Sequence, residues 1–395
     1  MANISTYNFE GKRALIRVDF NVPLNDKFEV TDNTRIVAAV PSIKKVLADG
    51  GSVVLMSHLG RPKSGPEDKF SLKHIIPALE TALGTSVKFG GGCMSDEAFA
   101  ASSNLNANEI LLLENLRFYK EETKGDAAFA EKLGKHGDVY VNDAFGTAHR
   151  AHASTTVVAN YLQDKMFGFL LAAEVENATK ILTNAQHPFT AIIGGAKVSS
   201  KMEVITSMLD KIDHLIIGGG MAYTFIKAQG GKIGSSLVED DYLDTALSIL
   251  KAAKESGVTI HLPADSIAAD AFSNEANTNE VLSSEIAEGW MGLDVGSRAI
   301  ESYKSVISES KTILWNGPLG VFEMDSFSNG TKALGEMIAL ATERGAYSLV
   351  GGGDSVAAAK QFGLDKKLSY VSTGGGALLE FLEGKTLPGV AAIEA

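Results

Sequence analysis

The chain has 395 residues, of which 45% are hydrophobic, and its 36 Lys and Arg stand against 48 Asp and Glu for a formal charge of −12. This acidic balance argues against general binding to nucleic acid or to an anionic membrane, so any anion must bind at a local cluster. The length exceeds what one compact core normally supports and predicts two domains. Cys93 is the only cysteine, which excludes an intrachain disulfide and a cysteine-based metal cage.

The N-terminal segment lacks the apolar core and cleavage pattern of a signal peptide. No apolar run approaches the ~20 residues that a membrane span needs. We therefore expect a cytoplasmic protein that does not associate with a membrane.

Short runs rich in Val, Ile and Leu recur along the chain, each followed by a glycine or polar loop and then by a helical pattern. In the first half they lie at residues 13–23, 52–62, 109–118 and 138–150, and in the second at residues 189–201, 214–225, 258–265, 312–323, 347–359 and 368–382. Continuous apolar strands that alternate with helices indicate parallel sheets covered on both faces. The pattern predicts an α/β fold with two doubly wound, Rossmann-like domains.

A segment without glycine separates the two halves. Residues 169–185 carry apolar side chains at helical spacing, which predicts one long helix, and Pro188 marks a boundary before the next strand. We expect a first domain at residues 1–170, a connecting helix at 171–185 and a second domain at 186–377, with a cleft between the domains.

The ends of the strands in the first half carry polar and charged side chains. They are Asp19, Asn21, His58, Arg61, Asn115, Arg117, Asp143 and Arg150, and Arg35 opens a nearby helical pattern. Ligands of open parallel sheets bind outside the carboxyl ends of the strands. A single arginine is more often a surface residue, but four on one sheet edge repel one another and need a compensating anion. Guanidinium groups bind carboxylate and phosphate oxygens, so we expect a substrate with two or more negative groups.

Two of these polar positions keep alternative interpretations. Asp19 either orients an arginine or forms an Asx turn before Pro23, and His58 either contacts a phosphate or is structural. His149 and His152 have the spacing of a metal pair, but no third ligand is evident, and we reject a metal site there.

The second half carries glycine triplets at residues 218–220, 351–353 and 374–376, and Gly194 and Gly195, between strands and helices. Backbone N–H groups at such positions can approach a phosphate closely, which indicates a nucleotide site. Asp354 is either an N-cap or a Mg²⁺ ligand, and Glu323 is either a ribose contact or a solvated side chain.

The segment IIGGAKVSSK, residues 192–201, ends an apolar run at two glycines and predicts the first turns of a helix. Lys197 and Lys201 would face each other at four-residue spacing, an arrangement that opposes helix formation unless an anion lies nearby. The spacing differs from the phosphate-binding loop with Gly-Lys-Ser/Thr, and Gly384-Lys385-Thr386 lacks the glycine that this loop requires. No G-x-G-x-x-G follows the first strand, which disfavours a dinucleotide-dependent dehydrogenase.

Ten motifs occur in a fixed order over residues 17–377: RVDFNVP, SHLGRP, LLENLRF, NDAFGTAHRAHAS, GGAKVSSK, GGGMAYTF, WMGLD, WNGPLGVFE, GGGDS and STGGGA. In this order and at this length the chain resembles the phosphoglycerate kinase family. The resemblance implies a glycolytic and gluconeogenic enzyme that transfers phosphoryl reversibly between 1,3-bisphosphoglycerate and ADP, giving 3-phosphoglycerate and ATP, with Mg²⁺. It also implies a monomer whose N-terminal domain binds the triose acid, whose C-terminal domain binds the nucleotide, and whose residues 378–395 return to the first domain.

The resemblance carries residue roles onto matching positions. The implied triose-binding set is Asp19, Phe20, Asn21, Arg35, His58, Leu59, Gly60, Arg61, Arg117 and Arg150. The implied nucleotide set is Lys201, Gly219, Gly292, Glu323, Gly352, Gly353, Asp354 and Ser355, with Asp354 as the metal contact. Arg35 and Lys197 are the implied catalytic residues, which stabilise the phosphoryl group in transfer. Ser355 stands where threonine is common in the family and Ala196 where serine is often found.

Phosphoryl transfer relies on alignment and charge neutralisation, and a carboxylate acceptor is already ionised near neutral pH, so no general base is expected. We expect closure about the 169–185 helix and the chain return near residue 376, which would exclude water. A non-catalytic two-lobed binding protein is the main alternative, but it predicts neither the glycine triplets nor the paired lysines. A coupled assay of ATP-dependent consumption of 3-phosphoglycerate separates it, and a dehydrogenase, from the kinase.

Overall fold

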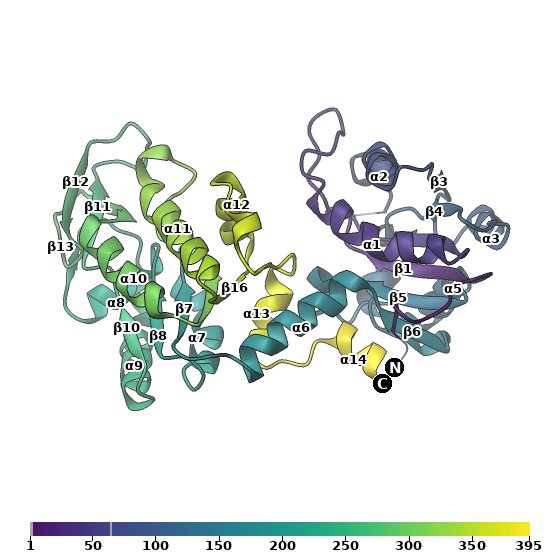
Figure 1. Ribbon diagram of the computed structural model, residues 1–395. Coiled ribbons are helices and arrows are strands. Elements are labelled where there is room, and N and C mark those ends of the chain that lie inside the picture. Colours follow the sequence, from purple (N-terminus) through teal and green to yellow (C-terminus); the bar gives the residue numbers. More distant parts are fainter. Residues whose placement is uncertain (1–2, 64) are drawn as a thin grey trace. The chain divides into compact units, whose positions relative to one another are not determined.

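The computed structural model describes residues 3–63 and 65–395 (Figure 1). Contacts divide the chain into two compact units, one formed by the chain up to Glu176 together with Thr386–Ala395 and the other by Asn177–Lys385. The long helix α6 (Phe169–Thr183) contains the boundary, so its first half belongs to the first unit and its second half to the second. None of the helices in the described part of the chain is long and apolar enough to cross a lipid bilayer.

The first unit contains a six-stranded parallel sheet with the order β3-β4-β2-β1-β5-β6. Its strands are β1 (Arg13–Val18), β2 (Ser52–Met56), β3 (Lys88–Phe89), β4 (Ile110–Leu112), β5 (Val139–Asp143) and β6 (Asp164–Phe167). Its helices are α1 (Thr34–Ala48), α2 (Ile76–Leu83), α3 (Asp96–Ser103), α4 (Lys120–Lys124), α5 (Ala127–Gly134) and α14 (Pro388–Glu394). Parallel pairing aligns the carboxyl ends of β2, β1 and β5 at one edge.

Alternation along β1 buries both faces of this sheet. Ala14 and Ile16 pack with Ile36 and Ile43 of α1, whereas Leu15 packs in a separate cluster with side chains of α3, α5 and α14. Buried positions in α1 recur at three- and four-residue spacing, which places one apolar stripe against the sheet.

The second unit contains a six-stranded parallel sheet with the order β10-β8-β7-β15-β16-β17. Its strands are β7 (Phe189–Ile193), β8 (His214–Ile217), β10 (Thr259–His261), β15 (Thr312–Asn316), β16 (Tyr347–Val350) and β17 (Tyr370–Val371). Its remaining helices are α7 (Met202–Met208), α8 (Met221–Ala228), α9 (Leu243–Glu255), α10 (Ser297–Glu309), α11 (Asn329–Glu343), α12 (Gly353–Gln361) and α13 (Gly376–Leu382).

The fully buried Trp315 lies at the centre of a core that joins this sheet to α10, α11 and α12. The neighbouring Leu314 is also fully buried and points to the other face of the strand, so both faces are covered. The predicted α/β class with two doubly wound parallel sheets is confirmed, and each of the ten predicted apolar runs contains a strand.

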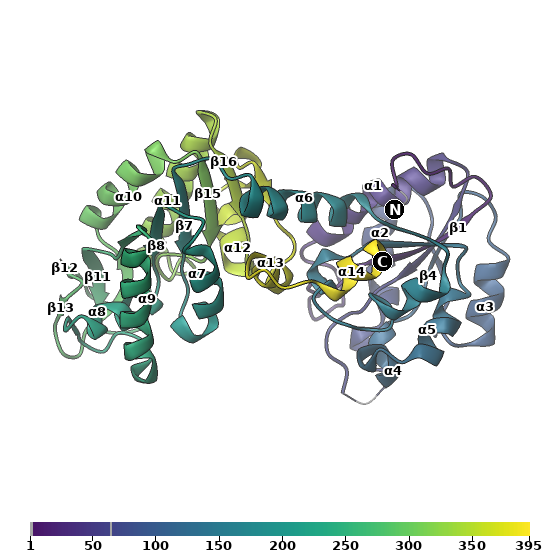
Figure 2. The same ribbon diagram turned by 90° about the horizontal axis from the view of Figure 1, so that it is seen from below.

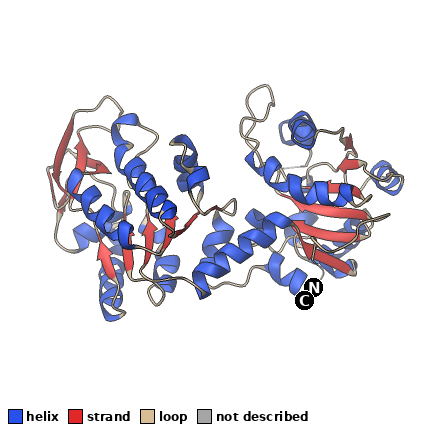
Figure 3. Ribbon diagram, viewed as in Figure 1, coloured by secondary structure: helices blue, strands red, loops and turns tan. Residues whose placement is uncertain are grey.

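The second unit also contains strands that the sequence did not predict (Figure 3). An antiparallel sheet has the order β12-β11-β14, with β11 (Asp265–Ala269), β12 (Thr278–Leu282) and β14 (Met291–Val295), and β9 (Lys232–Ile233) pairs with β13 (Glu285–Ile286). β12 is almost entirely exposed, so its sequence TNEVL lacks the apolar run by which buried strands are found.

The chain returns to the first unit at Thr386, and not at residue 378 as predicted. Leu378 and Leu382 of α13 are buried in the second unit, where the carbonyl oxygen of Leu382 accepts a hydrogen bond from Ser207 Oγ. α14 then packs beside β6, as Figure 1 shows, and Figure 2 shows the same helix from below. The Gly389 amide donates to the carbonyl of Ala148 at 2.8 Å, which anchors the returning segment close to the end of β5.

Candidate functional site

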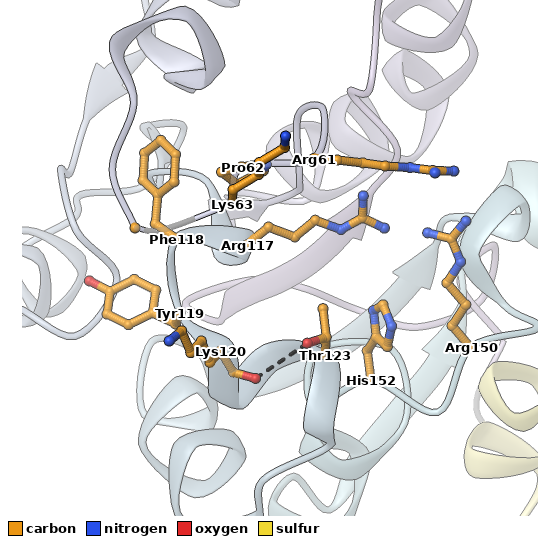
Figure 4. Close-up of a pocket in the computed structure, with 11 residues that line it drawn as sticks. Arg61, Pro62, Lys63, Arg117, Phe118, Tyr119, Lys120, Thr123, Arg150 and His152 are labelled. Carbon is orange, nitrogen blue, oxygen red and sulfur yellow. Dashed lines mark hydrogen bonds between the residues drawn. The ribbon is translucent and has the colours of Figure 1, made fainter.

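A basic cavity of about 510 Å³ lies at the carboxyl ends of the first sheet. The residues that line it are Arg61, Pro62, Lys63, Gly65, Arg117, Phe118, Tyr119, Lys120, Thr123, Arg150 and His152. Figure 4 shows the guanidinium groups of Arg61, Arg117 and Arg150 extending toward the same region. These arginines follow β2, β4 and β5, so the sheet order brings together three of the four predicted arginines.

Backbone contacts between the loops fix the position of Arg117. Its Nη1 donates to the carbonyl of Gly60 at 2.8 Å, and the Gly60 amide donates to Asn21 Oδ1 at 2.8 Å. Asn115 Nδ2 donates to the carbonyl of Leu59 at 2.7 Å. Gly60 has φ +62°, and a Cβ there would lie 2.4 Å from the Phe70 ring, so this turn requires glycine.

Burial and the neighbouring positive charges of Arg150 and Arg17 lower the pKa of the Arg117 guanidinium to about 10. The cavity therefore holds cations at an electrostatic cost, and a bound anion would relieve that cost. None of the lining residues that the structure describes is acidic.

Arg35, the fourth predicted arginine, makes a separate cluster with Asp19 and Asn21. Its Nη1 donates to Asp19 Oδ2 at 3.0 Å and to the carbonyl of Asn21 at 3.1 Å. The Asn21 amide donates to Asp19 Oδ1 at 3.3 Å, so Asp19 both forms the turn and orients the arginine. The ring of Phe20 is fully buried, and its amide donates to Ser57 Oγ. Phe20 can thus contribute only through its backbone and its packing.

His58 lies at the end of β2 and is only 3% exposed. Its Nδ1 lies 3.3 Å from Arg17 Nη2. Burial, followed by the charges of Arg17, Arg117, Arg150 and Arg35, lowers the pKa of the His58 imidazole well below its ordinary value. The ring is therefore neutral at physiological pH.

A second cavity, of about 470 Å³, lies at the strand ends of the second unit. Four predicted nucleotide-binding residues line it, namely Gly219, Gly292, Glu323 and Asp354. Its other lining residues are Gly195, Ala196, Gly220, Tyr223, Ser235, Leu237, Phe272, Met291, Leu293, Pro318, Leu319, Gly320 and Val321. The sequence did not single out Leu237 and Phe272, which are 49% and 62% exposed, because isolated apolar residues carry no motif.

Close backbone packing shapes this cavity. The Gly194 amide donates to the carbonyl of Asn316 at 2.9 Å, and the Met221 amide, at the start of α8, donates to Gly195 O at 3.0 Å. Gly219 has φ +68°, and a Cβ there would lie 2.6 Å from Gly195 O. A side chain at residue 219 would therefore separate the two glycine loops.

Lys197 and Lys201 do not lie on one α-helix, so that prediction is wrong. Lys197 has extended backbone, a short 3₁₀ helix covers Val198–Ser200, and α7 begins only at Met202. The four-residue repulsion expected between the two ammonium groups therefore does not arise. Lys197 is exposed, whereas Lys201 Nζ donates to Asn316 Oδ1. Burial lowers the pKa of Lys201, and the negative charges of Asp354 and Glu383 oppose that shift.

The start of α12 supports the loop after β15. Ser355 is fully buried, and its Oγ accepts a hydrogen bond from the Gly317 amide. Gly352 has φ +94° at the N-cap, and the exposed Gly353 begins the helix. The Ser355 hydroxyl thus holds the loop, and the amides of the first turn of α12 are the groups of this segment that can meet an anion.

The donor set near Asp354 fits a magnesium ion that is shared with a nucleotide. Asp354 is exposed and lines the cavity. Among the residues described, there is no group of three or more His, Cys, Asp or Glu side chains that could hold a metal by itself. Mg²⁺ is commonly held by one or two carboxylates together with phosphate oxygens and water, so a single carboxylate suffices beside a bound nucleotide.

Asp294 links the second cavity to α11. Its Oδ2 accepts a hydrogen bond from the Gly330 amide at 2.8 Å, in the first turn of α11. Thr331 Oγ1, one residue further, accepts from the amides of Leu319 and Gly320 in the cavity loop. Burial raises the pKa of the Asp294 carboxyl to about 7. The protonated Asp294 carboxyl contributes stability to the folded protein. This contribution is complete at pH values below the pKa of the carboxyl in the unfolded chain, and it is lost as pH rises through about 7.

We predict that Asp294→Asn, which cannot ionise, removes this pH dependence. Between pH 5 and 8 the free energy of unfolding of the variant should rise by about 2–3 kcal/mol relative to that of the parent, from ~1.4 kcal/mol per pH unit over roughly two units. Both tryptophans, Trp290 and Trp315, lie in the second unit, so their fluorescence during urea unfolding reports on it. Parallel pH profiles for the two proteins would contradict the prediction.

The comparisons with known proteins agree on one family. The model of the family described as phosphoglycerate kinase matches residues 4–385. The phosphoglycerate kinase of Porphyromonas gingivalis is 53% identical over 416 residues, covering 99% of each chain. The cytosolic phosphoglycerate kinase of Nicotiana tabacum is 50% identical, covering 100% of this chain and 98% of the relative. The solved structure of phosphoglycerate kinase from Coxiella burnetii superposes with a TM-score of 0.90 at 41% identity, covering 100% of this chain and 98% of that one.

Proposed function

We infer the roles of the two cavities from the finding that this chain belongs to the phosphoglycerate kinase family and has that phosphotransferase activity in glycolysis. Family membership removes both rival classes, the non-catalytic binding protein and the dehydrogenase. We propose that the basic cavity binds 3-phosphoglycerate or 1,3-bisphosphoglycerate, and that the glycine-lined cavity binds ATP or ADP. The observation that carries the proposal is the convergence of Arg61, Arg117 and Arg150 in a cavity whose described lining has no acidic residue.

The triose site has two parts in this proposal. Guanidinium groups of the basic cavity hold the phosphate end of the substrate through paired hydrogen bonds. Arg35, oriented by Asp19 and Asn21, and the neutral His58 bind the carboxylate end, and Leu59 and Gly60 contribute the backbone of the turn. The substrate thereby supplies the negative charge that the arginines need.

The nucleotide site has an apolar part and a polar part. The base lies against Leu237, Phe272 and Met291, and Glu323 accepts hydrogen bonds from ribose hydroxyls. The phosphates meet Lys201 and the amides of Gly352 and Gly353 at the start of α12. Asp354 holds Mg²⁺, which neutralises phosphate charge when it is bound.

Transfer in this scheme needs alignment and cations but no base. The acceptor carboxylate of 3-phosphoglycerate is ionised at neutral pH, so its oxygen attacks the γ-phosphorus directly while the bond to the β,γ-bridging oxygen of ATP breaks. Lys197 and Arg35 stabilise the charge on the phosphoryl oxygens during this step. We propose that the enzyme closes about α6 and the chain return, because direct transfer requires the two substrates to meet. We also propose that the enzyme is a monomer and that it acts in the cytoplasm. The tobacco relative is named as cytosolic.

Two variants test this division of the substrates. Arg117→Ala should weaken binding of 3-phosphoglycerate by at least about tenfold, through loss of a hydrogen bond to a charged group, and leave binding of MgADP unchanged. Gly219→Ala should weaken MgADP by at least about tenfold, by displacing the loop amides, and leave 3-phosphoglycerate unchanged. Isothermal titration calorimetry measures both ligands on each variant.

The matched control is Gly230→Ala, at a glycine with φ +90° and no atom within 4 Å of the added Cβ. It imposes left-handed strain similar to that at residue 219 but lies at the far end of α8, so it should leave both affinities unchanged. Loss of the same ligand in both test variants would refute the assignment of the two cavities, whereas coupled assays of turnover test the reaction itself.

A further inference from the structure

Arg17 is a buried cation outside the lining of the basic cavity. It is only 1% exposed and lies next to the end of β1, on the same face of the sheet as Leu15. Its Nε donates to Ser154 Oγ at 2.8 Å, its Nη1 donates to the carbonyl of Val18, and its Nη2 approaches His58 Nδ1 at 3.3 Å. Each of its three nitrogen atoms therefore has a partner.

A buried carboxylate balances this cation through Ser154. Glu122, in α4, is fully buried. Its Oε1 accepts a hydrogen bond from Ser154 Oγ at 2.6 Å, and its Oε2 accepts from the Ser154 amide at 2.9 Å. Because an unpaired buried charge is costly, the two charges and the hydroxyl between them form one interdependent unit.

We propose that Arg17 is a positioning residue that fixes His58 in the tautomer with its proton on Nε2, and that Ser154 and Glu122 hold Arg17 in place for this purpose. A guanidinium only donates hydrogen bonds, so the Arg17 contact requires Nδ1 to be the unprotonated acceptor. The neutral ring must then carry its proton on Nε2, as a donor. The link to catalysis rests on the proposed triose site.

Burial and then the surrounding positive charges keep the His58 ring neutral, so this tautomer is a fixed donor and not a titrating one. Protonation of Nδ1 would place two donors against each other, and the cations Arg117, Arg150 and Arg35 also face His58. Nε2 makes no hydrogen bond to another residue that the structure describes, which leaves its N–H for a ligand oxygen. His58 therefore offers one directed N–H to an anion without adding a further charge to an already repulsive site.

Nuclear magnetic resonance of the ligand-free, full-length protein tests the tautomer directly. Long-range ¹H–¹⁵N correlations should show His58 as the Nε2–H form and unchanged between pH 5 and 8. In Arg17→Met/Glu122→Gln, which removes both charges together, both tautomers should appear, because Nδ1 no longer faces a guanidinium donor. Tyr140→Phe is the matched control, because it removes the hydrogen bond from Tyr140 to the carbonyl of Ser154 without touching Arg17, and it should keep the parent tautomer.

An Nδ1–H form in the parent would overturn the proposal even if no variant folded. An unchanged tautomer in a folded double variant would overturn it as well. Neither readout depends on a ligand, so the outcome is separate from the fate of the proposed function.

Calorimetry with 3-phosphoglycerate connects the tautomer to binding. The double variant should bind the ligand about tenfold more weakly than the parent, as expected for a lost hydrogen bond to a charged group. In a His58→Ala background the same two substitutions should change the affinity less than twofold, because Arg17 acts through His58. An equal loss of affinity in both backgrounds would show that Arg17 does not act through His58. Absence of 3-phosphoglycerate binding to the parent would instead refute the proposed triose site.

Discussion

Replacing Lys197 by alanine is expected to lower kcat by roughly 10²- to 10³-fold, the loss seen when one donor that stabilises transition-state charge is removed. Lys197 is exposed and has extended backbone directly after the glycine loop, so its ammonium group is not committed to the core. Dissociation constants for 3-phosphoglycerate and MgADP should change by less than about threefold, because the transferring group carries its full demand for charge only in the transition state. Steady-state kinetics and calorimetry measure the two effects.

Two further variants sharpen the Lys197 experiment. Lys197→Arg keeps the charge and should retain more activity than Lys197→Ala. Lys251→Ala removes a well-exposed lysine from α9 of the same unit and should leave kcat unchanged, which controls for net charge. Unchanged turnover in Lys197→Ala would remove this residue from the catalytic set.

Arg35→Ala is expected to lower kcat/KM for 3-phosphoglycerate by roughly 10²- to 10³-fold. Its guanidinium is held by Asp19 at 3.0 Å and by the carbonyl of Asn21 at 3.1 Å, while its side chain remains 38% exposed. One nitrogen of the guanidinium is therefore anchored while the side chain stays partly exposed, so the group is held in position and accessible to an anion. Arg35→Lys keeps the positive charge but lacks the planar pair of N–H donors, so it should give an intermediate loss of kcat/KM.

Arg13→Ala is the matched control for Arg35→Ala. Arg13 also pairs with an aspartate, Asp138, at 2.9 Å. It is the first residue of β1, so it lies at the amino ends of the strands and not at their carboxyl ends. Its removal should leave kcat/KM unchanged even if it lowers stability. Equal kinetic losses in the two variants would mean that Arg35 acts through the fold and not through the substrate.

Much of the fold could be predicted because buried parallel strands have continuous apolar sequences. The strands that were missed lack that signal. β3 has two exposed residues, and β6 reads DKMF, so neither is an apolar run. Both lie at an edge of the sheet, where only one neighbouring strand is needed and polar side chains are tolerated.

The candidate site divides in the same way between what motifs reveal and what they do not. The ends of predicted strands singled out Arg61, Arg117 and Arg150, and the structure brings these three to one cavity because parallel strands share one carboxyl edge. Arg17 was overlooked although its sequence held a signal. A charged residue inside an otherwise apolar strand is almost never fully buried unless it is paired, and Ser154 links Arg17 to the buried Glu122.

The sequence by itself determined the family, the two parallel sheets and the positions of the glycine loops, because these depend on local patterns of apolar, charged and glycine residues. Only the tertiary structure decided which side chains meet. The sheet order brings β4, β2, β1 and β5 side by side although they are distant in the chain. The bond from Lys201 to Asn316, just before α7, and the bond from Arg17 to His58 likewise join residues that are tens of positions apart, and such contacts leave no periodicity in the sequence.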